Sequence, residues 1–225
     1  MQDVHTIGKY ADFAVGDIYT FAEACGVTLS VTLISLLIGT VIGIIFGLIR
    51  CSKNKFISFL PLIIMEPLRN SPLVVQLFIV YYGLPVMAGI ILKDYTAAII
   101  TLSLNTAAFF GVLVHNSIIA IPTSQWEAGY ALGHGKISTF INIIARQALR
   151  LLIPQAITLY IGQLQCSSII SLISMKDITR VGQLLSVRTM QPFVVWGIVF
   201  GLYYLISFPL ARLADYLAKR VDYSY

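Results

Sequence analysis

The segment IPTSQWEAGYALGHGKISTFINIIARQALR, residues 121–150, decides how this chain folds. It is polar, and the runs on both sides are apolar and long enough to cross a bilayer, whose hydrocarbon core is about 30 Å thick. A pair of amphipathic helices at a membrane surface is typical of a docking element for a partner in the cytoplasm. The segment therefore predicts both a membrane fold and a protein partner.

The composition places the rest of the chain in lipid. Of its 225 residues 58% are hydrophobic and 11% are charged, with a mean hydropathy of +0.86, whereas soluble domains carry about 25% charged residues. The net charge is +5, but no basic face is interleaved with aromatic residues, so we expect no nucleic-acid partner. Most Lys and Arg lie in segments expected on the cytoplasmic side, as the positive-inside rule requires: Arg50, Lys53, Lys55, Arg69, Lys136, Arg146, Arg150, Arg212, Lys219 and Arg220.

Hydropathy predicts one membrane domain over residues 1–225, with about five transmembrane helices. The expected spans cover about 26–49, 56–91, 95–120, 140–173 and 192–211. Residues 1–25 are polar and acidic and lack the positive start of a signal peptide, so we expect them outside the cell. We predict an all-α integral membrane protein with its N-terminus outside, its C-terminus inside and a helical insert at 121–139 in the cytoplasm.

The first span carries small residues at every fourth position, namely Ser35, Gly39, Gly43 and Gly47. Lipid provides no hydrophobic drive for helices to associate, so a stripe of small residues that lets two backbones approach closely predicts helix packing. We expect Gly39, Gly43 and Gly47 to contact another span.

The second span is interrupted by EPLRNSP at residues 66–72. Two prolines so close together break or kink a helix, and a charge in the middle of a bilayer costs about 2.5–3.5 kcal/mol. Glu66 and Arg69 must therefore pair, lie near the interface or face protein. Broken helices at membrane depth usually line a cavity.

Three amides in or near the spans are candidates for a substrate path. Polar side chains in spanning helices normally turn away from lipid, so we expect Asn105, Gln163 and Gln76 to face such a path. Packing hydrogen bonds explain the same residues equally well. The three cysteines and three histidines form no ligand cluster, so we predict no metal site.

The insert carries helix signals at both ends. Ser124 and Glu127 fit a capping box that starts a short helix, and Gly133 or Gly135 can end it in a left-handed turn. Trp126 and Tyr130 share a face, and a second helix is expected from about Ser138. A helix resting on lipid headgroups is the alternative, but the insert lacks the Lys- and Arg-rich face typical of that arrangement.

The insert resembles the EAA loop of ABC importer permeases, through EA at 127–128, Gly133 and QALR at 147–150. IP at 121–122 and QW at 125–126 resemble the polar amino acid subfamily in particular. Two further stretches resemble signatures of the same subfamily and stand in the right order: PLRNSPLVVQL at 67–77 with YYGLP at 81–85, and ITRVGQ at 178–183.

The resemblance implies a permease subunit with a fold like that of methionine importers, in a prokaryotic plasma membrane. Such a subunit dimerises, docks two ATPase subunits through the EAA helix and receives an amino acid from an extracytoplasmic binding protein. It implies these ATPase-coupling residues: Trp126, Glu127, Ala128, Gly129, Tyr130 and Gly133.

This chain departs from the family pattern at three places, one of them AR at 145–146, where Leu-Pro is usual after the loop. Gly129 stands where alanine is usual, which is expected to loosen the helix by up to about 1 kcal/mol. In the third span Val112 and HN at 115–116 replace an acidic residue and Arg-Gly. The missing acidic residue favours a heterodimer with a second permease over a homodimer.

Other classes of protein fit less well. GHGKI at 133–137 lacks the GxxxxGK[ST] spacing of a phosphate loop, so we expect no cofactor on this chain, with ATP and Mg on the partner ATPase. A membrane enzyme would need a convergent catalytic set, and a secondary transporter commonly shows inverted repeats; neither pattern is visible. Both classes remain the alternative to an ATP-driven importer.

Overall fold

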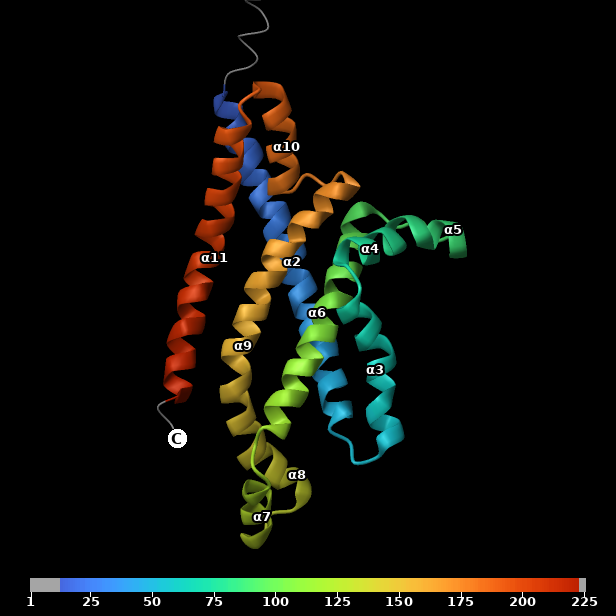
Figure 1. Cartoon of the computed structure of the whole chain (residues 1–225), viewed down its shortest axis with the longest axis vertical. Helices are drawn as coiled ribbons and strands as arrows, with labels where there is room; N and C mark the ends of the chain where they lie inside the picture. Colours follow the sequence, from blue (N-terminus) through green and yellow to red (C-terminus); the bar gives the residue numbers. More distant parts are fainter. Residues whose placement is uncertain (1–12, 223–225) are drawn as a thin grey trace, which may run out of the picture.

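The computed structural model describes residues 13–222, and for residues 220–222 only their helical backbone. The described residues form an elongated helical bundle without strands (Figure 1). The elements are α2 (Val15–Arg50), α3 (Lys55–Asn70), α4 (Leu73–Phe78), the π-helical turn η1 (Ile79–Gly83), α5 (Leu84–Ala88), α6 (Asp94–Ile119), α7 (Thr123–Ala131), α8 (Lys136–Thr139), the π-helical turn η2 (Phe140–Ile144), α9 (Ala145–Cys166), the 3₁₀ segment η3 (Ser167–Ile173), α10 (Ile178–Thr189) and α11 (Pro192–Asp222).

The predicted all-α membrane fold is confirmed. Within the described part of the chain, four helical stretches are long and apolar enough to cross a bilayer, and the bent pair α3 and α4–α5 makes a fifth if it is counted as one span. The first helix begins at Val15 rather than near residue 26, so the end of the predicted outer segment 1–25 is helical and continuous with the first span. Residues 1–12 of that segment lie outside the described residues.

The long helices α2 and α6 pack closely against each other along the glycine stripe. A Cβ added at Gly39 would lie 2.5 Å from the Cβ of Thr106, and one at Gly47 would lie 2.5 Å from the Cβ of Val114. One at Gly43 would lie 2.8 Å from the Cβ of Phe110. These separations are shorter than any ordinary van der Waals contact, so only glycine permits this approach of α2 to α6.

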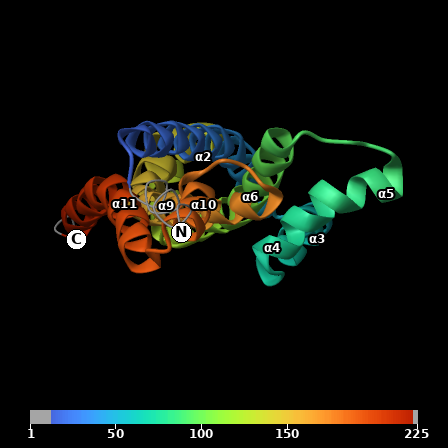
Figure 2. The same cartoon turned by 90° about the horizontal axis from the view of Figure 1, so that it is seen from above.

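The predicted interruption of the second span is confirmed, and the break lies at the end of the predicted segment 66–72. The helix α3 continues through Pro67 and ends at Asn70, and α4–α5 turns away by 108° after the break. Pro72 sits at the N-cap of α4, where its missing N–H costs nothing. Seen from above, α3, α4 and α5 lie to one side of the bundle and α11 lies at the other (Figure 2).

Glu66 and Arg69 form an ion pair just before this break. Arg69 Nη1 lies 3.1 Å from Glu66 Oε1, and the guanidinium also lies over the ring of Phe109, 5.7 Å from its centroid. Asn70 donates a further hydrogen bond to the Glu66 carboxylate at 2.8 Å. The two charges thus satisfy each other beside the bend, as the cost of an isolated charge in the membrane requires.

The last third of the chain contains one more helix than expected. Residues 175–191, which lie between the fourth and fifth expected spans, contain α10, whose N-terminus is capped by Asp177. The Asp177 carboxylate accepts the backbone N–H groups of Arg180 and Thr179, at 2.8 and 3.2 Å. The helix α10 lies at the end of the bundle opposite to α7 (Figure 1).

Candidate functional site

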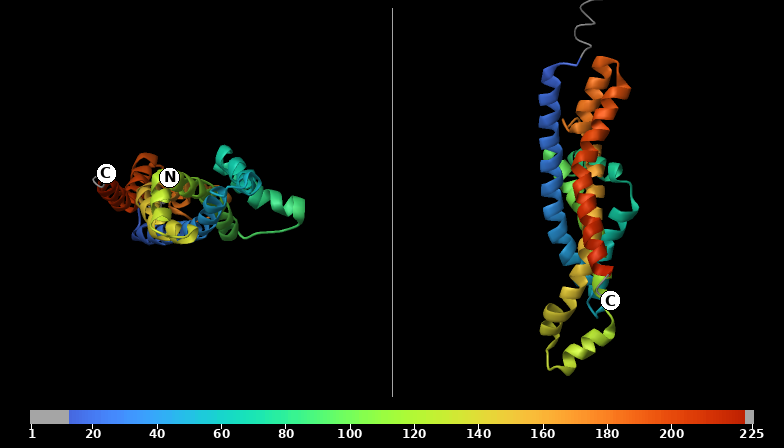
Figure 3. Two further views of the ribbon diagram at one scale, coloured as in Figure 1. Left: turned by 90° about the horizontal axis from the view of Figure 1, so that it is seen from below. Right: turned by 90° about the vertical axis from the view of Figure 1, so that its left-hand side faces the viewer.

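The polar insert forms a hairpin of α7 and α8 at one end of the molecule. This α7–α8 hairpin, residues 121–139, extends beyond the ends of α2 and α11 (Figures 1 and 3). The predicted capping box is wrong. The helix begins two residues earlier, at Thr123, with Pro122 in the N-cap position and no side-chain cap. Pro122 is extended (φ −55°, ψ 144°). Because proline disfavours the helical conformation of the residue before it, the new helix begins only after Pro122.

The turn between the two helices depends on Gly133. Gly133 has φ +82°, a left-handed conformation that a residue with a Cβ adopts with strain. The N–H groups of Gly133 and His134 return to the carbonyls of Tyr130 and Gly129, at 3.0 and 3.1 Å. The next helix begins at Lys136, slightly before the expected start at Ser138.

The inner face of α7 packs tightly on the start of the following helix. Gly129 is buried, and a Cβ there would lie 2.5 Å from Thr139 Cγ2. The Trp126 ring stacks on Phe140 at a centroid distance of 6.2 Å. Gly129 therefore also has a packing role beside its expected cost in helix propensity, because its missing Cβ lets α7 approach the fully buried Thr139.

The outer face of α7 is open. Glu127, Ala128 and Tyr130 are exposed, and Tyr130 keeps 45% of its surface accessible. At the tip Leu132 and Ile137 are each about three-quarters exposed, at 76% and 75%. The hairpin thus combines an inner face fixed to the bundle with an outer face that presents a carboxylate, a phenol and apolar side chains.

The second helix of the hairpin, α8, is the first turn of a long continuous helix. From Lys136 through η2, α9 and η3 to Ile173 it forms one stretch long and apolar enough to span a bilayer. Gln147, in its first part, donates a hydrogen bond to Gln125 on α7 at 3.0 Å. Through this bond and the Gly129–Thr139 contact, α7 is joined to the helix 136–173.

The three candidate path residues form one buried hydrogen-bond network. Gln163 on α9 donates to Asn105 on α6 at 2.8 Å. Asn105 in turn donates to Gln76 on α4 and to the Leu68 carbonyl on α3, both at 3.4 Å. All three side chains are at most 7% exposed. The network therefore connects two long helices with both sides of the bend in the second span.

Two further groups belong to this network and were not predicted. Gln76 Nε2 donates to the Leu68 carbonyl at 2.7 Å and to the Ser71 carbonyl at 3.1 Å. Leu68 and Ser71 contribute backbone groups freed by the break, and no side-chain pattern marks such groups in a sequence. Gln163 Oε1 is buried and accepts no hydrogen bond from the described residues.

An apolar cavity of about 500 Å³ lies at the base of the α7–α8 hairpin. Its lining includes Leu48 and Cys51 at the end of α2, Ile121, Trp126 and Phe140. Among the described residues no group of three His, Cys, Asp or Glu could hold a metal ion.

Comparison with known families decides the class of this protein. Residues 39–223 match the family described as "Binding-protein-dependent transport system inner membrane component". The chain belongs to this family. The match includes the α7–α8 hairpin, the bend in the second span and all three residues of the amide network.

Relatives within the family are permeases of amino acid transporters. This permease is 30% identical over 176 residues to the L-cystine transport system permease protein TcyB of Bacillus subtilis (strain 168), covering 78% of this chain and 75% of the relative. It is 27% identical over 161 residues to the glutamine transport system permease protein GlnP of Escherichia coli (strain K12), covering 71% of this chain and 74% of the relative.

Solved structures share the fold of this permease. An amino acid ABC transporter crystallised with histidines superposes with a TM-score of 0.84 at 26% identity, covering 92% of this chain and 96% of the other. The methionine ABC transporter MetNI in an inward-facing conformation gives a TM-score of 0.74 at 20% identity, covering 91% and 99%. The second likeness concerns the fold alone.

This protein is thus the permease component of an amino acid ABC transporter and a multi-pass protein of the inner membrane. Permeases of this family work together with an ATPase, a substrate-binding protein and a second permease. Membership places this chain among transporter permeases, whereas the sequence alone left a stand-alone secondary transporter and a membrane enzyme open.

Proposed function

We propose that this permease imports polar amino acids by docking the outer face of α7 on a separate ATPase, which binds ATP and Mg. In this arrangement the α7–α8 hairpin lies in the cytoplasm with the C-terminus, and the N-terminus lies outside. The observation that supports the proposal most directly is the α7–α8 hairpin itself, which extends past the bundle with Glu127 and Tyr130 exposed (Figure 3). An exposed short helix with aromatic and apolar side chains suits a groove on a partner.

The contacts behind α7 support a lever mechanism. Closure of the ATPase dimer displaces residues 126–132. The contact of Gly129 with Thr139 transmits this displacement to the helix 136–173, because no free space separates the two residues. Interfaces packed as closely as this one move as rigid units. The spans then rock about the contact of Gly39, Gly43 and Gly47 with α6, which alternates access to the two sides.

The amide network is our candidate for the substrate path. Asn105, Gln163 and Gln76 are neutral and converge where a broken helix meets two spanning helices, and broken helices at membrane depth usually line cavities. The unpaired Gln163 Oε1 can accept a hydrogen bond from a substrate ammonium group. We propose that an extracytoplasmic binding protein delivers the amino acid to this path.

A heterodimer fits the composition of the path better than a homodimer. Val112 on α6 stands where the subfamily usually carries an acidic residue, so two copies of this chain would provide no carboxylate at that position. A second permease with an acidic residue there would complete the path.

The docking proposal is tested by co-purification of the ATPase with two charge-reversal variants. Glu127→Arg combined with Tyr130→Ala changes only the outer face of α7, and both side chains are exposed, so the fold should survive. Asp215→Arg, an exposed carboxylate on α11, is the matched control. We expect the ATPase to be lost from the first variant and kept by the second. Equal recovery from both, with unchanged thermal unfolding, would refute docking through α7.

A further inference from the structure

The ion pair of Glu66 and Arg69 lies at membrane depth. Glu66 is the one acidic residue within the five expected spans. The helix α3 is continuous from Lys55, which ends the basic segment 50–55, to Asn70. At about 1.5 Å per residue, Glu66 lies about 16 Å along this helix from Lys55, which is about half of a hydrocarbon core about 30 Å thick. Arg69 follows within one further turn, so both charges lie inside the membrane rather than at its surface.

The pair is not sealed inside the bundle. The Glu66 side chain is 46% exposed and that of Arg69 is 29% exposed. Phe109, the ring over which the guanidinium lies, is 36% exposed. Ionised side chains at membrane depth face protein or a water-filled cavity and not lipid. This side of α3 and α6 therefore faces water or protein in the assembled transporter.

The ion pair adjoins the amide network. Leu68, whose carbonyl accepts hydrogen bonds from Asn105 and Gln76, directly precedes Arg69 in α3. Phe109 follows Asn105 by four residues of α6, so the two side chains lie on the same face of that helix. Arg69 therefore brings a cation to the edge of a network whose own side chains are all neutral.

The Arg69 guanidinium has donors that lack an acceptor. A guanidinium carries five N–H groups, and the hydrogen bond of Arg69 to another described side chain runs from Nη1 to Glu66 Oε1, at 3.1 Å. Arg69 Nε is buried and has no hydrogen-bond partner among residues 13–222. Buried donors are normally paired, so this one indicates an acceptor from outside the chain. A carboxylate fits the planar fork of a guanidinium with two parallel hydrogen bonds.

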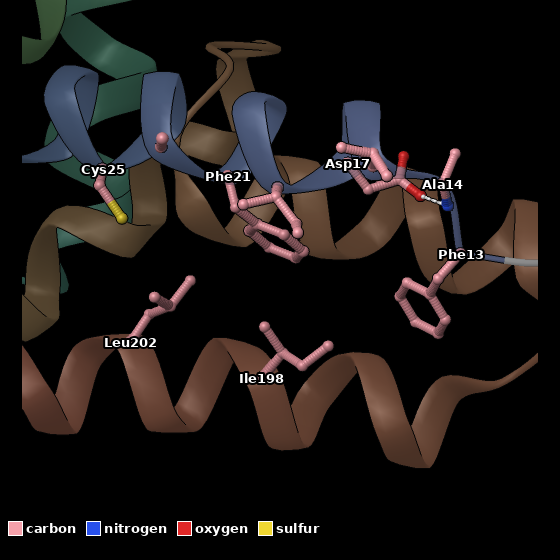
Figure 4. Close-up of a pocket in the computed structure, with 10 residues that line it drawn as sticks. Phe13, Ala14, Asp17, Phe21, Cys25, Ile198 and Leu202 are labelled. Atoms are coloured by element: carbon pink, nitrogen blue, oxygen red, sulfur yellow. Dashed lines mark hydrogen bonds between the residues drawn. The ribbon is translucent and has the colours of Figure 1, made fainter.

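The groove in Figure 4 offers no comparable cation. It has a volume of about 510 Å³ and lies between α2 and α11, where Phe21 points toward Ile198 and Leu202 (Figure 4). Asp17, the charged side chain on its wall, already accepts two hydrogen bonds from Arg188. The residues that line this groove include no Lys or Arg that could bind a carboxylate. Arg69 is therefore the better candidate for an amino acid ligand.

We propose that Arg69 binds the α-carboxylate of the amino acid as it passes the amide network. Glu66 holds the guanidinium at Nη1, which leaves the edge formed by Nε and Nη2 for the substrate. The substrate ammonium group then lies toward Gln163, whose buried Oε1 lacks a hydrogen bond. The inference rests on the proposed function and adds specificity to it. A compound without the carboxylate leaves Arg69 unpaired, so the path should reject it.

The test measures ligand binding by the permease pair with its ATPase in lipid nanodiscs, without the binding protein. A ligand that binds the folded state raises the midpoint of thermal unfolding, and the concentration dependence of this rise gives its affinity. Each standard amino acid is added in turn, and the one that stabilises wild type most is compared with its α-amide. The amide keeps the ammonium group but lacks the carboxylate. We expect wild type to bind the amino acid at least about tenfold more tightly than the amide.

Arg69→Gln combined with Glu66→Gln removes both charges, so neither is left unpaired in the membrane. The replacement at position 66 keeps a side-chain oxygen that can accept from Asn70. Arg212→Gln is the matched control, because Arg212 also lies over an aromatic ring, 4.9 Å from the centroid of Phe208, but on α11. We expect the double variant to bind the amino acid about 10- to 100-fold more weakly and the amide as before. The control should bind both as wild type does.

The unfolding midpoint without ligand separates a fold defect from a binding defect. If the double variant does not assemble, Arg69→Lys keeps the charge without the planar fork and should show the same selective loss. An equal affinity for the amino acid in wild type and variant, an equal loss for the amino acid and its amide, or no preference of wild type for the amino acid would overturn the role of Arg69. Absence of ATP-driven amino acid uptake by the complete wild-type transporter would instead refute the proposed function.

Discussion

Replacement of Gly129 by alanine tests the packing of α7 most sharply. The added Cβ would lie 2.5 Å from Thr139 Cγ2 and 3.0 Å from Thr139 Oγ1. Thr139 is β-branched and fully buried, so it cannot turn aside as the end of a long side chain can. Overpacking of this kind costs about 1–3 kcal/mol, while alanine gains about 1 kcal/mol over glycine in helix propensity.

The net effect of Gly129→Ala is then a loss of up to about 2 kcal/mol. For a protein of this size each kcal/mol lowers the midpoint of thermal unfolding by about 2–4 °C. In a Thr139→Ala background the obstructing methyl and hydroxyl are gone, and the nearest remaining atom is Ile143 Cδ1 at the end of a flexible side chain, 3.0 Å away. In that background the same substitution should stabilise the protein by about 1 kcal/mol, because only the gain in helix propensity remains.

The assay is thermal unfolding of the purified permease in lipid nanodiscs, in a double-mutant cycle. Gly162→Ala, on the α9 helix where an added Cβ meets nothing within 4 Å, is the control for propensity alone. The account predicts opposite signs for Gly129→Ala in the two backgrounds. If Gly129→Ala raises the midpoint as much as Gly162→Ala does with Thr139 intact, the close contact is not present and the lever reasoning fails.

Three other outcomes are expected. Gly47→Val should prevent accumulation of the protein in the membrane, because even the added Cβ would lie 2.7 Å from a carbonyl oxygen of α6. Gly201→Val, which has open space around it, should accumulate normally. Immunoblots of membranes compare the amounts of the two variants. Asn105→Ala leaves the buried Gln163 amide without its partner, which should cost about 1–3 kcal/mol in thermal unfolding and lower amino acid uptake. Asp177→Ala should cost about 0.5–2 kcal/mol through the lost cap, and Asp177→Asn much less, because its side-chain oxygen still caps α10; a midpoint equally low for both variants would contradict the capping role.

Local signals in the sequence predicted the membrane fold well. The long apolar runs predicted the spanning helices. The EPLRNSP segment predicted the bend, because proline disrupts a helix at its own position in the chain. The glycine stripe indicated a close helix contact, and Gly133 indicated a left-handed turn, because both depend on a missing side chain. The sequence could not show that the partner of the stripe is α6, since this depends on the tertiary arrangement.

Predictions failed where two signals competed or where partners are distant in the chain. Pro122 occupies the N-cap position that the capping box assigned to Ser124, so the helix begins two residues earlier than predicted. The role of Gly129 depends on Thr139, which belongs to a different helix. The Asp17–Arg188 pair joins residues 171 positions apart, and no local pattern connects them.

Cross-linking from Tyr130 tests the central claim most directly. A photoreactive phenylalanine analogue placed at Tyr130, on the exposed face of α7, should form a cross-link to the ATPase in native membranes. The same analogue at Val187, which is 76% exposed at the opposite end of the bundle, should form none. Should the ATPase be captured from Val187 and not from Tyr130, the assignment of α7 as the coupling helix would be contradicted.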